Sequence, residues 1–131
     1  MRVLIVQSRP VLAEDWQRCF AKAGALSVTA DTQQQATSIL ASRPIDVILL
    51  DLILREGAAF AVADYAQYRQ PHAQIIVATD SPFFADGSIF SYVPNARAFV
   101  PLRTPPEDLL AMAEHFASVD HDLLTLDHVA R

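Results

Sequence analysis

The stretch Ile45-Asp46-Val47-Ile48-Leu49-Leu50-Asp51 decides the fold of this chain. Its centre is a continuous aliphatic run, Val47 to Leu50, which is typical of a parallel strand that is buried on both faces. The run ends directly on a carboxylate, Asp51. Because open α/β sheets bind ligands outside the carboxyl ends of their strands, Asp51 lies where such a sheet holds functional groups.

Other apolar runs along the chain predict further strands, and amphipathic stretches between them predict helices. The predicted strands, besides 47–50, are Val3–Val6, Leu26–Ala30, Ile75–Ala78 and Ala98–Val100. The predicted helices begin at Pro10, at Asp31 with Gln34 as a capping box, at Ala58, at Ser81-Pro82 and at Pro106. This alternation predicts one parallel sheet with right-handed crossovers and helices on both of its faces.

Composition limits the classes of protein that the chain can represent. It has 131 residues, of which 52% are hydrophobic, and a net charge of −5, so it can fill one core but offers no basic surface for nucleic acid. A lone cysteine, Cys19, excludes a disulfide framework and a cysteine-based zinc site. The first apolar run is too short for a signal peptide and no run is long enough to span a bilayer, so we expect a cytoplasmic protein without membrane contact.

Taken in order, these segments resemble the bacterial response-regulator receiver domain. The run that ends at Asp51 is similar to the family's third strand, which places Asp51 at the phosphoacceptor position. Ile75-Ile76-Val77-Ala78-Thr79 resembles the fourth strand and its switch hydroxyl, Thr79. The stretch from Asn95 to Val100 resembles the fifth strand, with Phe99 at the switch aromatic. From the residues alone, the alternative for Thr79 is a strand-end hydroxyl that caps the following loop, and for Phe99 it is a core residue.

The resemblance implies a flavodoxin-like α/β fold. This is a doubly wound, five-stranded parallel sheet in strand order 2-1-3-4-5 with helices on both faces. It covers residues 1–117, which leaves 118–131 as a C-terminal tail or helix extension. In the tail, Phe116, Val119, Leu123, Leu126 and Ala130 have the spacing of a coiled-coil seam, although a tail packed on its own domain is an alternative.

The positions that depart from the family pattern carry the functional prediction. The family's Mg²⁺-binding acidic pair after the first strand is here Gln7-Ser8, and its lysine after the fifth strand is Leu102. Mg²⁺ requires hard oxygen ligands, and phosphoryl transfer relies on positioning and charge neutralisation by the metal and the lysine. We therefore expect no metal site and no cofactor, and we expect no enzymatic activity because no general base is paired with a nucleophile.

Three arginines follow the first, third and fifth predicted strands. In the expected strand order, Arg9, Arg55 and Arg103 surround Asp51, so one of them could form an ion pair with its carboxylate. The alternative is that they are solvated loop residues with no shared role. An arginine-lined pocket would also suit a small anion or a nucleotide.

The sequence thus predicts an atypical, pseudo-receiver-like domain in two-component or phosphorelay signalling. The leading interpretation is an interaction module that works without phosphorylation, and the rivals are a weakly phosphorylatable receiver using Asp51 and an anion sensor. No second domain is recognisable in these residues. We therefore expect action through a protein partner, a histidine kinase or a downstream signalling protein, or through a homodimer formed by the fourth helix, the fifth helix or the tail. The fourth helix is rich in aromatic residues that could anchor a contact: Phe83, Phe84, Phe90 and Tyr92.

Overall fold

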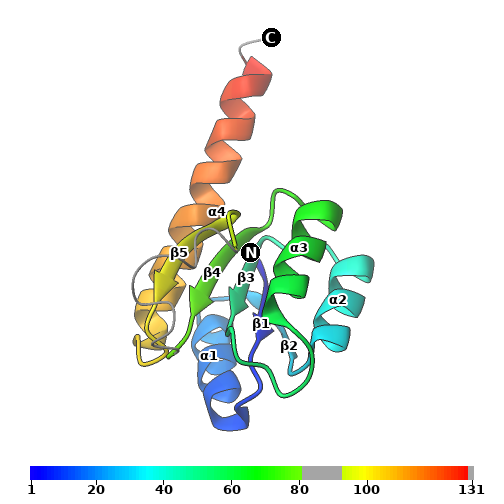
Figure 1. Ribbon diagram of the computed structural model, residues 1–131. Helices are drawn as coiled ribbons and strands as arrows, with labels where there is room; N and C mark the ends of the chain where they lie inside the picture. Colours follow the sequence, from blue (N-terminus) through cyan, green and yellow to red (C-terminus); the bar gives the residue numbers. More distant parts are fainter. Residues whose placement is uncertain (81–92, 130–131) are drawn as a thin grey trace.

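A computed structural model of the chain describes residues 1–80 and 93–129, with side chains through residue 118 (Figure 1). Strands and helices alternate along the chain as the sequence predicts. The strands are β1 (Arg2–Val6), β2 (Leu26–Ala30), β3 (Val47–Leu50), β4 (Gln74–Ala78) and β5 (Ala96–Val100). The helices are α1 (Pro10–Lys22), α2 (Gln33–Ser42), α3 (Ala59–Arg69) and α4 (Pro106–Val129). The helix predicted at Ser81-Pro82, with its aromatic residues, lies outside the described residues.

The strands form one parallel sheet in the order β2-β1-β3-β4-β5, which confirms the predicted order 2-1-3-4-5. Val6 at the end of β1 is in register with Ala30 at the end of β2 and with Leu50 at the end of β3. The residues that follow these three strands therefore meet at one edge of the sheet.

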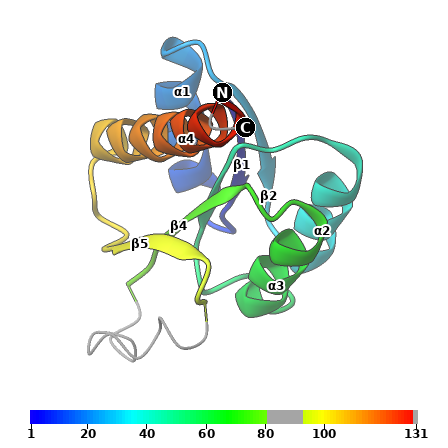
Figure 2. The same cartoon turned by 90° about the horizontal axis from the view of Figure 1, so that it is seen from above.

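Helices cover both faces of the sheet, α1 and α4 on one side and α2 and α3 on the other (Figure 2). Side chains of β3 alternate between the two cores. Ile48 and Leu50 belong to the core under α2 and α3, whereas Val47 and Leu49 belong to the core under α1 and α4. This double burial explains why the strand is a continuous aliphatic run.

The α1/α4 core contains the large aromatic side chains of α1. Trp16 and Phe20 are fully buried there, and they pack with Leu109 and Ala113 of α4. Cys19 is half-buried beside them, and its burial raises the pKa of the thiol. The cysteine therefore behaves as a small core residue.

The beginning of α2 differs from the prediction by one residue. Thr32, not Asp31, is the N-cap, and its hydroxyl accepts a hydrogen bond from Gln35 N–H at 3.2 Å. The Gln35 side chain in turn accepts from the Asp31 N–H at 2.9 Å. Asp31 does not cap the helix because its carboxylate pairs with Arg55 across the sheet edge.

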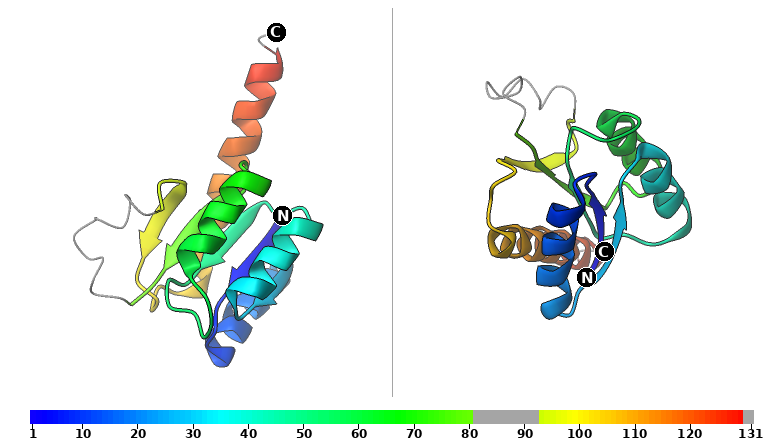
Figure 3. Two further views of the ribbon diagram at one scale, coloured as in Figure 1. Left: turned by 45° about the vertical axis from the view of Figure 1, so that its right-hand side comes forward. Right: turned by 90° about the horizontal axis from the view of Figure 1, so that it is seen from below.

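Helix α4 is the longest element and runs through residue 117 to Val129 as one helix. Its second half extends beyond the end of the sheet and stands clear of the other described elements in Figure 1 and in the left view of Figure 3. Among residues 1–80 and 93–129, no helix combines the length and hydropathy needed to cross a bilayer.

Candidate functional site

Asp51 lies where the ends of three strands meet. Its backbone N–H donates to the Val6 carbonyl at 3.0 Å, which joins the end of β3 to the end of β1. The neighbouring Gln7 N–H donates to the Ala30 carbonyl at 3.0 Å, which joins β1 to β2 in the same way. Only 2% of Asp51 is exposed to solvent. The carboxylate that the sequence singled out is therefore buried at the predicted edge of the sheet.

Burial dominates the electrostatics of the Asp51 carboxyl and raises its pKa above the usual range. Several groups act against this effect by favouring the ionised form. The Ile53 N–H donates to Oδ1 at 3.0 Å, the polar side chains of Gln7 and Thr79 act in the same direction, and the Arg9 guanidinium attracts the charge. The donors lower the pKa less than burial raises it, so Asp51 binds a proton more readily than an exposed aspartate.

Gln7 and Ser8 stand at the positions of the family's acidic pair, and both are used in local hydrogen bonds. Gln7 Oε1 accepts from the Arg9 N–H at 3.0 Å, while Gln7 Nε2 is buried with no partner at hydrogen-bonding distance among the described residues. The effect of this amide on Asp51 is therefore exerted over more than hydrogen-bonding distance. Ser8 Oγ donates to the Asp31 carbonyl at 2.6 Å and accepts from the Arg55 N–H at 2.7 Å.

The predicted ion pair between Asp51 and an arginine is not formed within the described part of the chain. Arg55 instead contacts Asp31 Oδ2 at 2.9 Å and Glu56 Oε1 at 3.7 Å. Arg9 influences Asp51 only through its charge. Arg103 is exposed and forms no ion pair with a described residue. Asp31 takes Arg55 because the Ser8 hydroxyl draws the loop after β3 toward the end of β2.

Contacts that the sequence did not reveal hold this loop, residues 51–58, on the start of α2. The Gln33 N–H donates to the Glu56 carbonyl at 3.1 Å, and Gln33 Oε1 accepts from the Ala58 N–H at 2.8 Å. Gly57 has a φ of 88°, and a Cβ at this position would lie 2.3 Å from Gln33 Cβ. Glycine is therefore required here both by its conformation and by this close approach. A glycine between a strand and a helix was the available sequence signal.

The remaining predicted site residues lie on β4, β5 and the loop after β5. Thr79 is half-buried after β4, where its N–H donates to the Val100 carbonyl at 3.0 Å and its hydroxyl faces Asp51. Phe99 is half-buried and packs against the α2/α3 core. Leu102, at the position of the family's lysine, is 4% exposed and belongs to the α1/α4 core. The structure thus brings Thr79 to Asp51 and places Leu102 in the core.

A cavity of about 330 Å³ lies beside the site, between the first turns of α1 and α2. Its charged lining residues are Glu14 and Asp31, and no arginine lines it. Two carboxylates repel an anion, so this cavity does not provide the arginine-lined pocket that the sequence suggested.

The comparisons with known proteins identify the fold. No family model and no curated protein matches the sequence. Among solved structures, a CheY-like response-regulator receiver domain protein from Methanospirillum hungatei JF-1 is similar at 19% identity and a TM-score of 0.84, over 92% of this chain and 96% of that one. The non-phosphorylated HemR receiver domain from Leptospira biflexa is similar at 20% identity and a TM-score of 0.75, over 89% of this chain and 94% of that one.

A third similar structure has a metal in its site. It is the receiver domain of the sensor histidine kinase PA1611 from Pseudomonas aeruginosa PAO1, with a magnesium ion coordinated in its active-site cleft. Its identity to this chain is 14% and its TM-score 0.77, over 89% of this chain and 97% of that one. The three likenesses show that the chain has the receiver fold, as the resemblance implied.

Proposed function

We propose that this chain is a receiver-like module of two-component or phosphorelay signalling that works through a protein partner without being phosphorylated. The observation that carries the proposal is the surroundings of Asp51. Among the described residues, this buried carboxylate meets hydrogen-bond donors and the charge of Arg9, but no group of three side chains there could hold a metal, and the one lysine of the sequence, Lys22, is the last residue of α1. A dianionic phosphoryl group would therefore meet little of the neutralising charge that phosphoryl transfer needs.

The residues present do not fit Mg²⁺. Of the oxygens around the site, Gln7 Oε1 and Ser8 Oγ already take part in hydrogen bonds that hold the neighbouring loops. Within the described residues, no group of three His, Cys, Asp or Glu side chains could hold a metal at Asp51 or elsewhere. Mg²⁺ needs near-octahedral oxygen coordination, which this set does not supply.

The position of Leu102 supports the same proposal. Its side chain fills the α1/α4 core together with Trp16 and Leu109, so the receiver lysine has been replaced by a packing residue. A lysine at this position would have to leave the core to reach Asp51. The change therefore exchanges a group that contacts a phosphoryl group for one that stabilises the fold.

A phosphorylation assay tests the proposal directly. The full chain is incubated with acetyl phosphate and Mg²⁺, and intact-mass spectrometry measures a phosphoryl adduct. We expect no adduct on Asp51 above the level of the Asp51→Asn variant. A stoichiometric adduct that Asp51→Asn abolishes would refute the proposal and establish the main rival, a receiver that accepts phosphate weakly on Asp51.

A gain-of-function variant makes a negative result informative. Gln7→Asp, Ser8→Asp and Leu102→Lys together restore the charges that the receiver reaction uses. We expect this triple variant to acquire an adduct, and to show a rise in melting temperature with Mg²⁺ that the wild type lacks. If the triple variant folds but still acquires no adduct, the missing charges are not the reason for inactivity.

The finer parts of the proposal concern partner and setting. We propose a histidine kinase or a downstream signalling protein as the partner, which would place the module in the cytoplasm, and we propose no catalytic turnover. The anion-sensor alternative has lost its support, because Arg55 pairs with Asp31 and the adjoining cavity is acidic. In the homodimer alternative, the α4 helices of two copies would pair, so the acidic charge of this helix bears directly on it.

A further inference from the structure

Helix α4 is longer than the part of it that packs on the sheet. Leu109 and Ala113 are fully buried, and the helix contacts the α1/α4 core as far as Ala117. It then continues to Val129, and Figures 1 and 3 show this projecting half beyond the sheet. At 1.5 Å per residue, the projecting half is roughly 18 Å long.

A single apolar seam follows the whole helix. The seam positions alternate in steps of three and four residues: Leu109, Met112, Phe116, Val119, Leu123 and Leu126. In the first half this seam faces the core, where Leu109 is buried and Met112 and Phe116 are half-buried against it. Its continuation past the sheet is the pattern by which a helix pairs with another helix.

The charges of α4 are all of one sign. The chain has fifteen acidic residues and ten Lys and Arg residues; six of the acidic residues lie in this helix and none of the basic ones does. The rest of the chain therefore has ten basic and nine acidic residues. Helix stability does not explain this distribution. Acidic residues favour the first turn of a helix, but Asp120, Asp122 and Asp127 lie in the second half, and Asp127 near the C-terminus opposes the helix dipole.

These three aspartates occupy the positions that flank the seam, and such positions select the partner in a coiled coil. In a parallel pair of two copies, position 122 of one helix would face position 127 of the other. In an antiparallel pair, positions 120 and 127 would face the same positions of the second copy. Both arrangements set aspartate against aspartate, so the helix disfavours a second copy and matches a helix with basic flanks.

We infer that the projecting half of α4 is a docking site for an amphipathic helix of a partner protein that carries an apolar seam flanked by Lys and Arg. The inference deepens the proposed function by naming the class of partner, and it rests on that function only in assuming a protein partner. Asp51 has no part in it, so the phosphorylation assay and the docking experiment can fail independently.

Two designed peptides test the inference on the full chain. Both have leucine at the seam positions, and they differ only in carrying lysine or glutamate at the flanking positions. Titration calorimetry should show that the lysine peptide binds at least about tenfold more tightly than the glutamate peptide. This preference should shrink in 1 M salt, where the Debye length falls to about 3 Å. Equal binding of the two peptides, or binding of neither, would overturn the inference.

Variants of α4 locate the site. Leu123→Asn should abolish binding of the lysine peptide, and Asp127→Lys should weaken it at least about tenfold. Glu114→Lys is the matched control, because it makes the same kind of charge reversal on the outer face of the helix, away from the seam, and should leave binding unchanged. Circular dichroism of each variant checks that it folds. An Asp127→Lys variant that binds as Glu114→Lys does would contradict the assignment.

Sedimentation velocity tests the other occupant, a second copy of the chain. We expect the wild type to remain a monomer as its concentration is raised. Asp122→Lys creates an attractive pairing with position 127 of a second parallel helix, so this variant should associate more strongly than the wild type. A wild-type dimer that Leu123→Asn dissociates would show that the seam serves self-association and would overturn the inference.

Discussion

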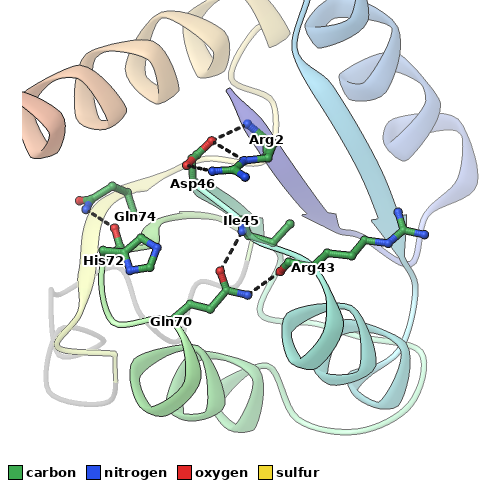
Figure 4. A network of polar contacts seen from close by, with 7 residues as sticks. All are labelled: Arg2, Arg43, Ile45, Asp46, Gln70, His72 and Gln74. Carbon is green, nitrogen blue, oxygen red and sulfur yellow. Dashed lines mark hydrogen bonds and ion pairs between the residues drawn. The ribbon is translucent and has the colours of Figure 1, made fainter.

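Gln70 offers a sharp test of how the strand that ends at Asp51 is held at its other end. This glutamine follows α3, is 8% exposed, and links the end of α3 to the end of α2 and to the segment before β3. Figure 4 shows its contacts with Arg43 and Ile45. Its Nε2 donates to the Leu40 carbonyl at 2.8 Å and to the Arg43 carbonyl at 2.6 Å. Its Oε1 accepts from the Ile45 N–H at 2.8 Å, two residues before β3. Gln70→Leu keeps the approximate size of the side chain and removes all three hydrogen bonds.

The expected loss follows from which partners water can reach. The Leu40 carbonyl and the Ile45 N–H are buried, and each buried polar group left without a partner costs about 1–3 kcal/mol. The Arg43 carbonyl is partly exposed and can be hydrated. Burying leucine in place of an amide offsets part of the cost, roughly 1 kcal/mol. We therefore expect the free energy of unfolding to fall by about 1–5 kcal/mol, and a loss near the middle of this range would lower the melting temperature by roughly 10 °C.

Urea unfolding followed by circular dichroism measures this loss as a lower midpoint at an unchanged slope. Gln67→Leu is the matched control, because it is the same substitution three residues earlier, at an exposed position of α3, and it should change stability by less than about 0.5 kcal/mol. If Gln70→Leu proves no more destabilising than Gln67→Leu, the three hydrogen bonds do not hold the end of the strand as we argue.

Four further predictions concern Asp51, the arginines and the core. Burial raises the pKa of Asp51, so the folded state binds its proton more tightly than the unfolded state, and stability is lost as the pH rises through the folded-state pKa. Asp51→Asn should therefore be more stable than the wild type at pH 7, and urea unfolding should show this advantage disappearing below about pH 3.9. Arg9→Ala should raise the Asp51 pKa measured by carboxyl ¹³C NMR titration, whereas Arg55→Ala should leave it unchanged; an equal shift in both would contradict the pairing of Arg55 with Asp31. Because that pair is exposed, Arg55→Ala should cost less than about 1 kcal/mol in unfolding free energy. Phe20→Ala, in the α1/α4 core, should cost about 3–5 kcal/mol in thermal unfolding, and a loss under 1 kcal/mol would mean that the core closes over the gap.

The sequence was sufficient for the central strands β1, β3 and β4 because their burial on both faces imposes continuous aliphatic runs such as Val47 to Leu50. The order of the strands followed from the resemblance to the receiver domain, and the sheet confirms it. It was less reliable where tertiary contacts choose between local options. Asp31 and Thr32 are both good N-caps, and only the pairing of Asp31 with Arg55 leaves Thr32 to cap the helix. The pairing of Arg55 with Asp31 rather than with Asp51 has the same origin, since the loop after β3 is shaped by residues that lie distant in sequence.

For the site as well, the sequence predicts the residue types but not the properties that depend on tertiary contacts. The replacement of the receiver's acidic pair by Gln7 and Ser8, and of its lysine by Leu102, could be predicted, because it depends only on which residue types stand at the strand ends. The raised pKa of Asp51 could not be predicted, because it is the net result of burial and of donors on separate segments, the Ile53 N–H, Gln7 and Thr79 among them. A carboxylate at a strand end is thus visible in the sequence, whereas its solvation depends on the folded loops.

Helix α4 is continuous, so the orientation of its projecting half follows from that of its packed half. After Pro106 the helix contains no glycine or proline through Val129, so it has no natural hinge between its packed and its projecting half. A partner bound to the projecting half would consequently have a fixed rotational position about the helix axis relative to the sheet. One residue inserted near residue 117 would turn that partner by about 100° and move it about 1.5 Å outward. The number of residues in the helix therefore sets the orientation of a bound partner relative to the sheet. We expect this number to be constrained as much as the identity of the residues that contact the partner.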